Sequence, residues 1–219
     1  MKSSAGSKSR LQVESPALAH FKRVDKALYQ AGLPHAVVLS SRITIKRTNS
    51  SLFKSLASSV IGQQLSTRAA QTIRDRVSML CGVSGITPHA LEIILTEDLR
   101  AVGLSAAKIK TLKELSRAVL HENLNLLKLK KLPQEEIKKT LTSIWGIGPW
   151  TVQMFCIFSL GHPDVFSSGD LGLARGMELL YGLPKNSPRE TLEEISEIWA
   201  PHRSYACLIL WAHYDARKS

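Results

Sequence analysis

Hydrophobic residues recur at helical spacing along most of this 219-residue chain. The longest such run covers residues 52–77, where apolar positions fall three or four residues apart and therefore share one face of a helix. Its apolar positions are Leu52, Phe53, Leu56, Val60, Leu65, Ala69, Ile73 and Val77. A Gly-Gln-Gln segment at 62–64 interrupts the run midway, so we predict two helices joined by a turn.

The remaining pattern is also helical, apart from one short segment. In residues 40–47, Ile43 and Ile45 alternate with polar residues, which fits a short strand or an extended loop. Apolar periodicity and capping residues predict the other helices, two or three of them within 87–120 and the rest over 18–31, 135–144, 149–160, 171–181, 191–200 and 204–213. We therefore predict an all-α fold of two helical lobes with a cleft between them, formed by residues 16–219 after a flexible basic tail at 1–15.

A glycine-rich turn separates the helices predicted over 135–144 and 149–160. Gly146 and Gly148 carry no side chain and tolerate positive φ, so another backbone can approach this turn closely. Pro149 suits the first position of a helix, where its missing N–H has no cost. The free N–H groups and partial positive charge at the start of this helix are suited to bind a phosphate oxygen.

Asp170 is the candidate catalytic carboxylate. It follows Gly148 by 22 residues and directly precedes the helix predicted over 171–181. A carboxylate at that position is stabilised by the positive end of the helix. Aspartate is also a leading N-cap residue, so the sequence alone leaves a purely structural role open.

The composition favours a folded protein with a polyanionic partner. Lys and Arg outnumber Asp and Glu by 29 to 18, which gives a net charge of +11 and a pI near 9.8. This excess favours nucleic acid first and an acidic membrane surface second, although a basic protein without such a partner has the same charge. No apolar run approaches the about 20 residues of a membrane span, and residues 1–10 lack the apolar core of a secretory signal.

Three cysteines, Cys81, Cys156 and Cys207, are widely spaced among apolar neighbours. This spacing predicts reduced core thiols rather than disulfides, and no Cys-x-x-Cys or Cys/His cluster indicates zinc. Reduced thiols are typical of intracellular proteins. We therefore expect a cytoplasmic, nucleoid-associated protein or a nuclear one.

Three blocks in order resemble the helix-hairpin-helix DNA glycosylases, and more narrowly the DNA-3-methyladenine glycosylase II type. They are Ile-Trp-Gly-Ile-Gly-Pro-Trp-Thr at 144–151 with Asp170 downstream, Ser-Val-Ile-Gly-Gln-Gln-Leu-Ser-Thr-Arg-Ala-Ala at 59–70, and Trp-Ala-Pro-His-Arg-Ser-Tyr-Ala-Cys-Leu-Ile-Leu-Trp at 199–211. The likeness covers roughly residues 50–214, and too few residues precede it for the mixed N-terminal domain of longer members, so it implies the compact form. It implies base-excision repair, in which a flipped alkylated base, 3-methyladenine with 7-methylguanine as a further candidate, is removed from duplex DNA by hydrolysis.

The resemblance also implies roles for individual residues. Asp170 would stabilise an oxocarbenium-like transition state and activate water. Gln64 would stand at the wedge position that fills the space of the flipped base. The other DNA contacts would come from Gln63, Leu65, Gly146, Gly148 and Thr151. The substrate pocket would be lined by Trp150, Met154, Trp199, His202 and Tyr205. Of these aromatic residues, Trp150 is alternatively a core tryptophan, while Trp199, His202 and Tyr205, together with Trp211, alternatively pack the last helix.

Trp150 also bears on the reaction type. Relatives that nick the strand through a Schiff base carry a lysine at this point of the hairpin, so a tryptophan implies a monofunctional enzyme, and an indole can stack on a cationic base. The family often holds a monovalent cation at hairpin carbonyls, which here would be those of Thr142, Ile144 and Gly146. The resemblance implies no required cofactor beyond this Na⁺ or K⁺, and the four cysteine ligands of an iron–sulfur cluster are lacking in the sequence. The expected partner is duplex DNA containing alkylated bases, bound by a monomer.

Two other readings remain open at this point. A binding module could use the same hairpin to hold damaged or abasic DNA without excising a base. A bifunctional glycosylase/lyase for oxidised bases is the weaker alternative. Asp170 and Trp150 favour catalysis over binding alone.

Overall fold

The computed structural model describes residues 15–35 and 47–217, whose regular elements are all helices joined by turns and loops, with no strand among them. The all-α prediction is therefore confirmed for this part of the chain. The predicted tail at 1–15 and the predicted strand or loop at 40–47 lie almost wholly outside the described residues. Within the described part, no helix has both the length and the apolar character needed to cross a membrane.

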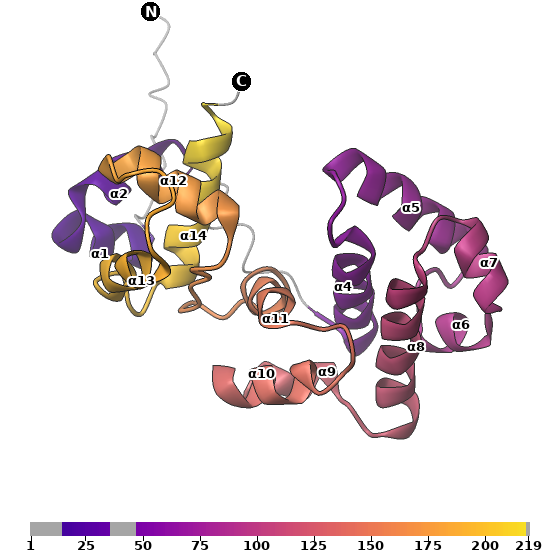
Figure 1. Ribbon diagram of the computed structural model, residues 1–219. Helices are drawn as coiled ribbons and strands as arrows, with labels where there is room; N and C mark the ends of the chain where they lie inside the picture. Colours follow the sequence, from indigo (N-terminus) through magenta and orange to yellow (C-terminus); the bar gives the residue numbers. More distant parts are fainter. Residues whose placement is uncertain (1–14, 36–46, 218–219) are drawn as a thin grey trace, which may run out of the picture.

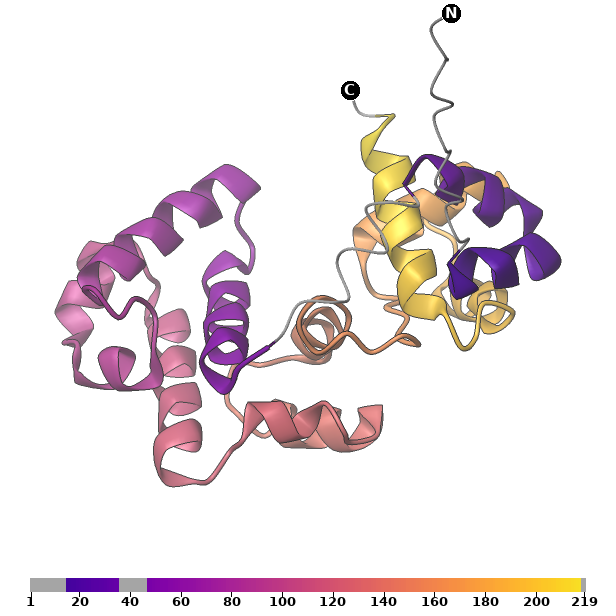
Figure 2. The same cartoon turned by 180° about the vertical axis from the view of Figure 1, so that it is seen from behind.

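The helices form two groups with a connecting segment between them (Figure 1). One group joins the N-terminal helices to the C-terminal ones: α1 (Pro16–Val24), α2 (Lys26–Gly32) with a 3₁₀ turn (Leu33–His35), α12 (Leu171–Tyr181), α13 (Arg189–Glu197) and α14 (Arg203–Asp215). The other contains α4 (Asn49–Gly62), α5 (Thr67–Leu80), α6 (Pro88–Ile93), α7 (Thr96–Ala101) and α8 (Ala106–His121). The connecting segment comprises α9 (Leu126–Leu129), α10 (Gln134–Thr142), α11 (Pro149–Phe155) and a π-helical turn (Cys156–Leu160). Viewed from behind, α11 again lies between the two groups (Figure 2).

The predicted break in the run 52–77 is confirmed. Helix α4 ends at Gly62 and α5 begins at Thr67, with Ser66 as its N-cap. Gln64, at the tip of the turn between them, has a left-handed backbone with φ of 58°. The turn therefore presents a non-glycine residue in a conformation that few side chains adopt.

The predicted helix over 18–31 is in fact two helices. Asp25 has an extended backbone with φ of −151° and ψ of 91°, and its side chain caps α2 by accepting the N–H of Leu28. Its other carboxylate oxygen accepts hydrogen bonds from Tyr181 and Trp199, more than 150 residues away. Partners this distant in sequence leave no local signal, which is why the periodicity of 18–31 predicts one continuous helix.

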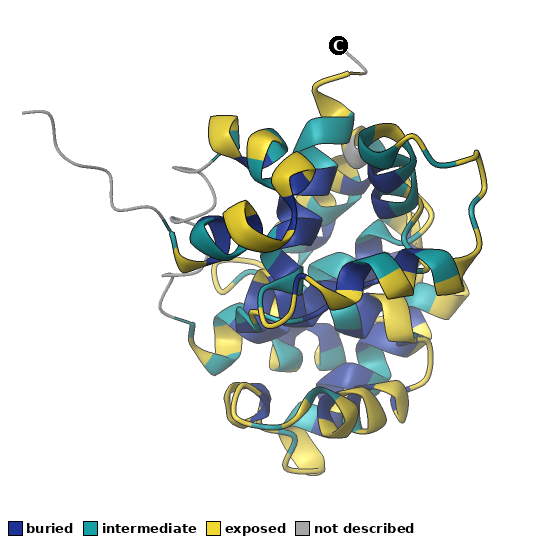
Figure 3. Ribbon diagram, turned by 90° about the vertical axis from the view of Figure 1, so that its left-hand side faces the viewer, coloured by how far each residue is buried: buried dark blue, intermediate teal, exposed yellow. Residues whose placement is uncertain are grey.

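Many helices are buried on one side and exposed on the other (Figure 3), and helices of both groups contribute buried apolar residues, for example Phe21 and Leu56. The tightest helix pairing joins α12 to α14, where glycine removes the side chain that would separate them. A Cβ on Gly176 would meet the carbonyl oxygen of Leu210 at 2.8 Å, and one on Gly172 would meet Trp211 at 3.0 Å. These glycines are one helical turn apart on α12, so they form the face on which α14 packs.

Candidate active site

The two hairpin glycines serve different purposes. Gly146 has φ of 83°, and a Cβ there would lie 2.0 Å from Oγ1 of Thr111 on α8, so no other residue fits this contact. Gly148 is the N-cap of α11, and a Cβ there would meet nothing within 4 Å. Gly146 therefore fixes the hairpin against α8, whereas Gly148 leaves the start of α11 open to an approaching group. This arrangement suits the phosphate-binding role predicted for the turn.

Asp170 lies at the N-terminus of α12, where its carboxylate has three hydrogen-bond donors. Oδ1 accepts the N–H of Leu173 and the indole N–H of Trp211, both at 2.9 Å. Oδ2 accepts the indole N–H of Trp150 at 2.8 Å. The residue is half-buried, and Oδ2 keeps a lone pair for a further partner. Asp170 is thus an N-cap, as one alternative holds, and also a carboxylate that is held by two indoles and accessible from outside.

Trp150 links this carboxylate to the hairpin. It is the second residue of α11, which begins at Pro149, and its indole is 43% exposed. A single hydrogen bond therefore connects the helix whose start is open to phosphate with the candidate catalytic acid. The predicted site residues Gly148, Trp150 and Asp170 are brought together by this contact.

Two aromatic residues of the site were missed or left undecided by the sequence. The sequence does not decide whether Trp211 lines the cleft or packs the last helix, and it carries no pattern that indicates Phe158. Phe158 stacks on Trp211 with ring centroids 5.3 Å apart and planes at 27°, and Phe158 is 41% exposed. The Gly172-x-x-x-Gly176 spacing was the available signal, because small residues one turn apart predict close packing of another helix. That helix is α14, which carries Trp211.

The loop that carries Asp170 is anchored at both ends. Near Asp170, the hydroxyl of Ser167 donates to Oε1 of Gln153, and the amide of Gln153 donates to the carbonyl of Phe166. At its start, Asp164 accepts two hydrogen bonds from the Arg203 guanidinium, at 2.7 and 2.8 Å. Burial raises the pKa of Asp164, but these hydrogen bonds and the charge of Arg203 outweigh it and hold the pKa below its usual value. The carboxylate of Asp170 is therefore presented by a fixed loop.

The Gln63–Leu65 turn contacts the hairpin directly. The Gln63 amide donates to Oγ1 of Thr151 at 3.1 Å and to the carbonyl of Gly146 at 3.4 Å. The side chain of Thr151 is 2% exposed, so it holds the turn and is not itself presented to DNA. Gln64 and Leu65 are exposed. The amide of Gln63 is therefore used to hold the turn against the hairpin, whereas Gln64, the predicted wedge, and Leu65 are exposed to solvent.

Two predicted pocket residues belong to the core. Trp199 has 0% exposure, and its indole donates to Oδ2 of Asp25 at 2.8 Å. Met154 is 8% exposed within the same continuous core. The prediction that Trp199 lines the pocket is corrected, because its only polar atom is used by a buried carboxylate. Met154 is likewise covered by its neighbours rather than exposed to a base.

His202 and Tyr205 pack against each other, with ring centroids 5.9 Å apart. His202 also contacts His20 and Phe21 of α1, at centroid distances of 5.4 and 6.4 Å. Burial lowers the pKa of His202 and raises that of Tyr205. These contacts lead to α1 and not to Asp170, so a pocket role for His202 and Tyr205 stays a prediction.

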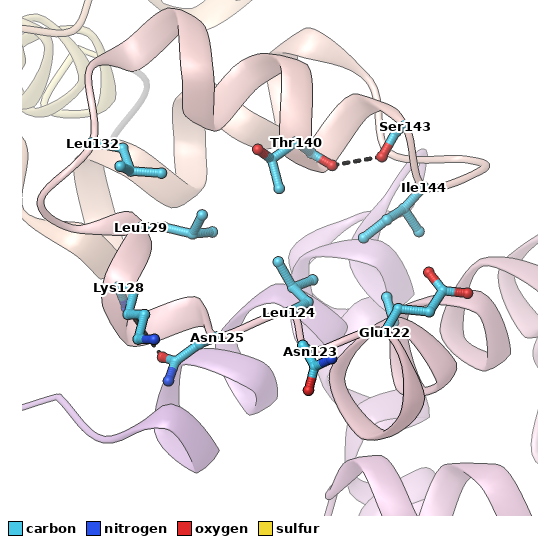
Figure 4. A pocket seen from close by; sticks show the side chains of 11 residues that line it. Glu122, Asn123, Leu124, Asn125, Lys128, Leu129, Leu132, Thr140, Ser143 and Ile144 are labelled. Carbon is cyan, nitrogen blue, oxygen red and sulfur yellow. Dashed lines mark hydrogen bonds between the residues drawn. The ribbon is translucent and has the colours of Figure 1, made fainter.

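Two surface hollows each include a residue that the sequence analysis names as a candidate. One of about 220 Å³ is lined by Asp170 together with Gly169 and Arg189, so the start of α12 borders a surface hollow. Another hollow, of about 390 Å³, lies between the end of α8 and α10 (Figure 4). Ile144 is the one predicted site residue that lines it. Its walls combine apolar residues such as Leu124, Leu129 and Ile144 with neutral polar ones and two of opposite charge, Glu122 and Lys128. It holds neither of the tryptophans that contact Asp170.

No cluster of three or more His, Cys, Asp or Glu side chains that could hold a metal occurs in the described ranges. The hairpin carbonyls offer a different donor set. The carbonyl of Ile144 accepts the N–H of Ile147 at 3.1 Å, and that of Gly146 accepts the Gln63 amide. A carbonyl oxygen has two lone pairs, so both can also face a cation. The three cysteines are free thiols, and burial raises the pKa of Cys156 to about 12.

Comparison of the sequence and the structure with known proteins finds a matching protein family and several similar DNA repair proteins. The sequence matches the HhH-GPD superfamily of base excision DNA repair proteins over residues 57–201. A DNA-3-methyladenine glycosylase 1 of Schizosaccharomyces pombe is 36% identical over 164 residues, 73% of this chain and 71% of that protein. A solved DNA-3-methyladenine glycosidase from Bacillus halodurans is similar with 33% identity and a TM-score of 0.78, covering 94% of this chain and 92% of that one. The S. pombe 3-methyladenine DNA glycosylase solved in complex with abasic DNA has 31% identity and a TM-score of 0.75, over 90% and 95% of the two chains.

Proposed function

This chain belongs to the HhH-GPD superfamily of base excision DNA repair proteins, in its DNA-3-methyladenine glycosylase family, and we propose that it is a monofunctional enzyme. Its reaction is hydrolysis of the N-glycosidic bond of alkylated bases in duplex DNA, 3-methyladenine first and 7-methylguanine second. It acts as a monomer where genomic DNA is, in the bacterial cytoplasm or in the nucleus.

The observation that carries this proposal is the hydrogen bond between Trp150 and Asp170. Trp150 stands in the first turn of α11, whose open start suits a DNA phosphate. Asp170 stands at the N-terminus of α12. DNA gripped at the hairpin would therefore have one of its nucleotides within reach of the carboxylate.

Catalysis rests on the charge of the sugar in the transition state. A base inside a duplex cannot be reached, so the nucleotide first rotates out of the stack. As its glycosidic bond breaks, the sugar develops positive charge, which a fixed carboxylate stabilises. Each indole donates to an oxygen of Asp170, so the carboxylate cannot turn away from the sugar. The lone pair of Oδ2 that stays free orients the attacking water and accepts its proton.

The residue at position 150 supports hydrolysis without strand cleavage. A lyase needs an amine to form a Schiff base, and the indole of Trp150 cannot form one. Its ring is 43% exposed beside Asp170, where it can stack on a cationic base. An alkylated purine that already carries positive charge is a good leaving group. One carboxylate and no strong general acid therefore suffice for such substrates.

The turn at 63–65 supports a wedge function. Gln64 is exposed at its tip with φ of 58°, and the Gln63 amide ties the turn to the hairpin. The wedge and the phosphate grip are thus held at a fixed separation. Gln64 would enter the stack through the minor groove, where its amide can bond the unpaired partner base.

A monovalent cation, Na⁺ or K⁺, fits the hairpin as part of this proposal. The main-chain oxygens of Thr142, Ile144 and Gly146 would hold it, and two of these keep a lone pair beside their present hydrogen bond. When bound, the ion adds positive charge beside the phosphate-binding N–H groups. Replacing K⁺ by tetramethylammonium at constant ionic strength is expected to weaken DNA binding, and unchanged affinity would remove the cation from the proposal.

The test is base release from duplex DNA that has been methylated with dimethyl sulfate. The wild-type protein is expected to release methylated adenine and to leave abasic sites, which alkali converts to strand breaks on a gel. No covalent protein–DNA adduct is expected on borohydride treatment. Tight binding of abasic DNA without any release would instead identify a binding module, and a trapped adduct would identify a lyase.

A further inference from the structure

An exposed tryptophan stands at the corner of the hairpin with a lysine over its ring. Trp145 precedes Gly146 and lies in the turn closed by the hydrogen bond from Ile147 to Ile144. Its side chain is 47% exposed, which is unusual for so large an apolar group. Nζ of Lys110, on α8, lies 4.4 Å from the centroid of the ring. This cation–π pair takes no part in the site built around Asp170.

Lys110 is held on the same element that supports the hairpin. Its neighbour Thr111 fills the space left by the missing side chain of Gly146, so two successive residues of α8 contact two successive residues of the hairpin. The loop between α10 and α11 passes beside α8 at this point (Figure 1). The ammonium group of Lys110 is therefore placed beside the turn whose N–H groups suit a phosphate.

Within the described ranges, the ammonium group of Lys110 is not bound by an oxygen acceptor. Other lysines of α8 are: Lys108 donates to the carbonyl of Ile61, and Lys113 donates to those of Glu92 and Ile94. Lys110 is exposed, and over residues 15–35 and 47–217 it forms no salt bridge. A cation that is held on an aromatic face but has no anionic partner is available to an anion from outside.

We propose that Trp145 and Lys110 form a second phosphate-binding site beside the hairpin, in which the indole positions the ammonium group against the DNA backbone. The inference rests on the proposed function, because the hairpin must face DNA. Holding a flexible lysine before binding reduces the entropy lost when it meets its phosphate. Trp145 is accordingly a positioning residue, and Lys110 makes the contact.

The salt dependence of DNA binding tests this site. Binding of a duplex with a stable abasic-site analogue would be measured between 50 and 300 mM KCl for the wild type and for Lys110→Gln. Loss of one phosphate contact lowers the magnitude of the slope of log K against log salt by about 0.9. The matched control is Lys22→Gln, which removes the same charge from the other lysine–aromatic pair, Lys22 over Tyr29 on α1 and α2. Its slope is expected to equal that of the wild type.

Trp145→Leu separates positioning from contact. Loss of the ring weakens binding by about two- to fivefold, in line with an exposed cation–π pair of ~0.5–1 kcal/mol. In the Lys110→Gln background the same change is expected to have no further effect. Equal slopes for Lys110→Gln and Lys22→Gln would overturn the proposal, as would an undiminished effect of Trp145→Leu without Lys110. Base release by the wild type is measured separately, so failure of this site and failure of the proposed function are distinguishable.

Discussion

Two aspartates of this protein have nearly the same local chemistry and different surroundings. Asp25 and Asp170 each cap a helix by accepting the N–H three residues on, and each accepts hydrogen bonds from two aromatic donors. Asp25 is 8% exposed, and its donors, Tyr181 and Trp199, belong to the core group. Asp170 is half-buried, and its donor Trp150 is 43% exposed.

The difference between them teaches how a capping carboxylate becomes a candidate catalytic group. Asp25 has one oxygen committed to the N–H of Leu28 and the other to Tyr181 and Trp199, so it fastens the junction of α1 and α2 to the end of α12 and to the segment after α13. Asp170 retains an accessible oxygen, and one of its donors stands on the helix that begins at the hairpin. Capping and aromatic donors are common to both, and only exposure beside the hairpin, which we propose binds phosphate, distinguishes Asp170.

The largest expected effect is the loss of base release when the charge of Asp170 is removed. Asp170→Asn is expected to lower single-turnover base release by on the order of 10³-fold, because a neutral amide cannot stabilise the charged sugar. Asparagine still caps α12, so the free energy of unfolding should change by less than about 1 kcal/mol. Release rates and urea unfolding would be measured together, with Asp75→Asn, a change of the same charge on the surface, as the control.

The same substitution at Asp25 tests whether that aspartate stabilises the fold. Asp25→Asn places an amide group against the buried donors of Tyr181 and Trp199, which is expected to cost about 2–5 kcal/mol of unfolding free energy. At a temperature where the variant is folded, base release should remain within a fewfold of the wild type. An Asp25→Asn protein of normal stability would contradict the fastening role.

A third aspartate sharpens the comparison through pH. The pKa of Asp164 lies below its ordinary value, because Arg203 outweighs the effect of burial. A carboxyl group whose pKa is lower in the folded than in the unfolded protein stabilises the fold at pH values above its unfolded pKa of about 4. This stabilisation is lost as the pH falls through the folded-state pKa. Asp164→Asn is therefore expected to cost about 1–3 kcal/mol at pH 7 and progressively less in more acidic solution. Urea unfolding at pH 7 and pH 3.5 checks this, and a difference that grows on acidification would have the wrong sign.

The smallest expected effect concerns the indole that distinguishes Asp170. Trp150→Phe keeps a ring for stacking but removes the N–H bonded to Oδ2, so base release should fall about fivefold, as loss of ~1 kcal/mol implies. Single-turnover rates at saturating enzyme measure this effect. Release that is unchanged in Trp150→Phe would mean that the hydrogen bond does not position the carboxylate.

Local patterns were sufficient for most of the fold. Periodicity located the break at 62–64 and the helix 171–181, because glycine, capping residues and apolar spacing act within a few residues. They failed at Asp25, whose extended backbone depends on Tyr181 and Trp199 far along the chain. The helix break there has no glycine or proline to mark it.

The candidate site could be selected where backbone chemistry leaves a trace in the sequence. Residue type and spacing indicate Gly146, Gly148 and Asp170 as candidates, and the family resemblance supplies their roles. The aromatic residues could not be sorted in this way, because a tryptophan bonded to a buried carboxylate and one bonded to an accessible carboxylate look alike in sequence. Trp199 proved to be the first kind and Trp211 the second, and the contact that separates them is the partner of each indole N–H.

The central claim is that Asp170 acts on the sugar and is not needed to hold DNA. Its most direct test is to measure, for Asp170→Asn, both the affinity for a duplex with an abasic-site analogue and the rate of base release from methylated DNA. We predict affinity within a fewfold of the wild type and release lowered on the order of 10³-fold. Release at the wild-type rate, or affinity and release lost in equal measure, would contradict the account.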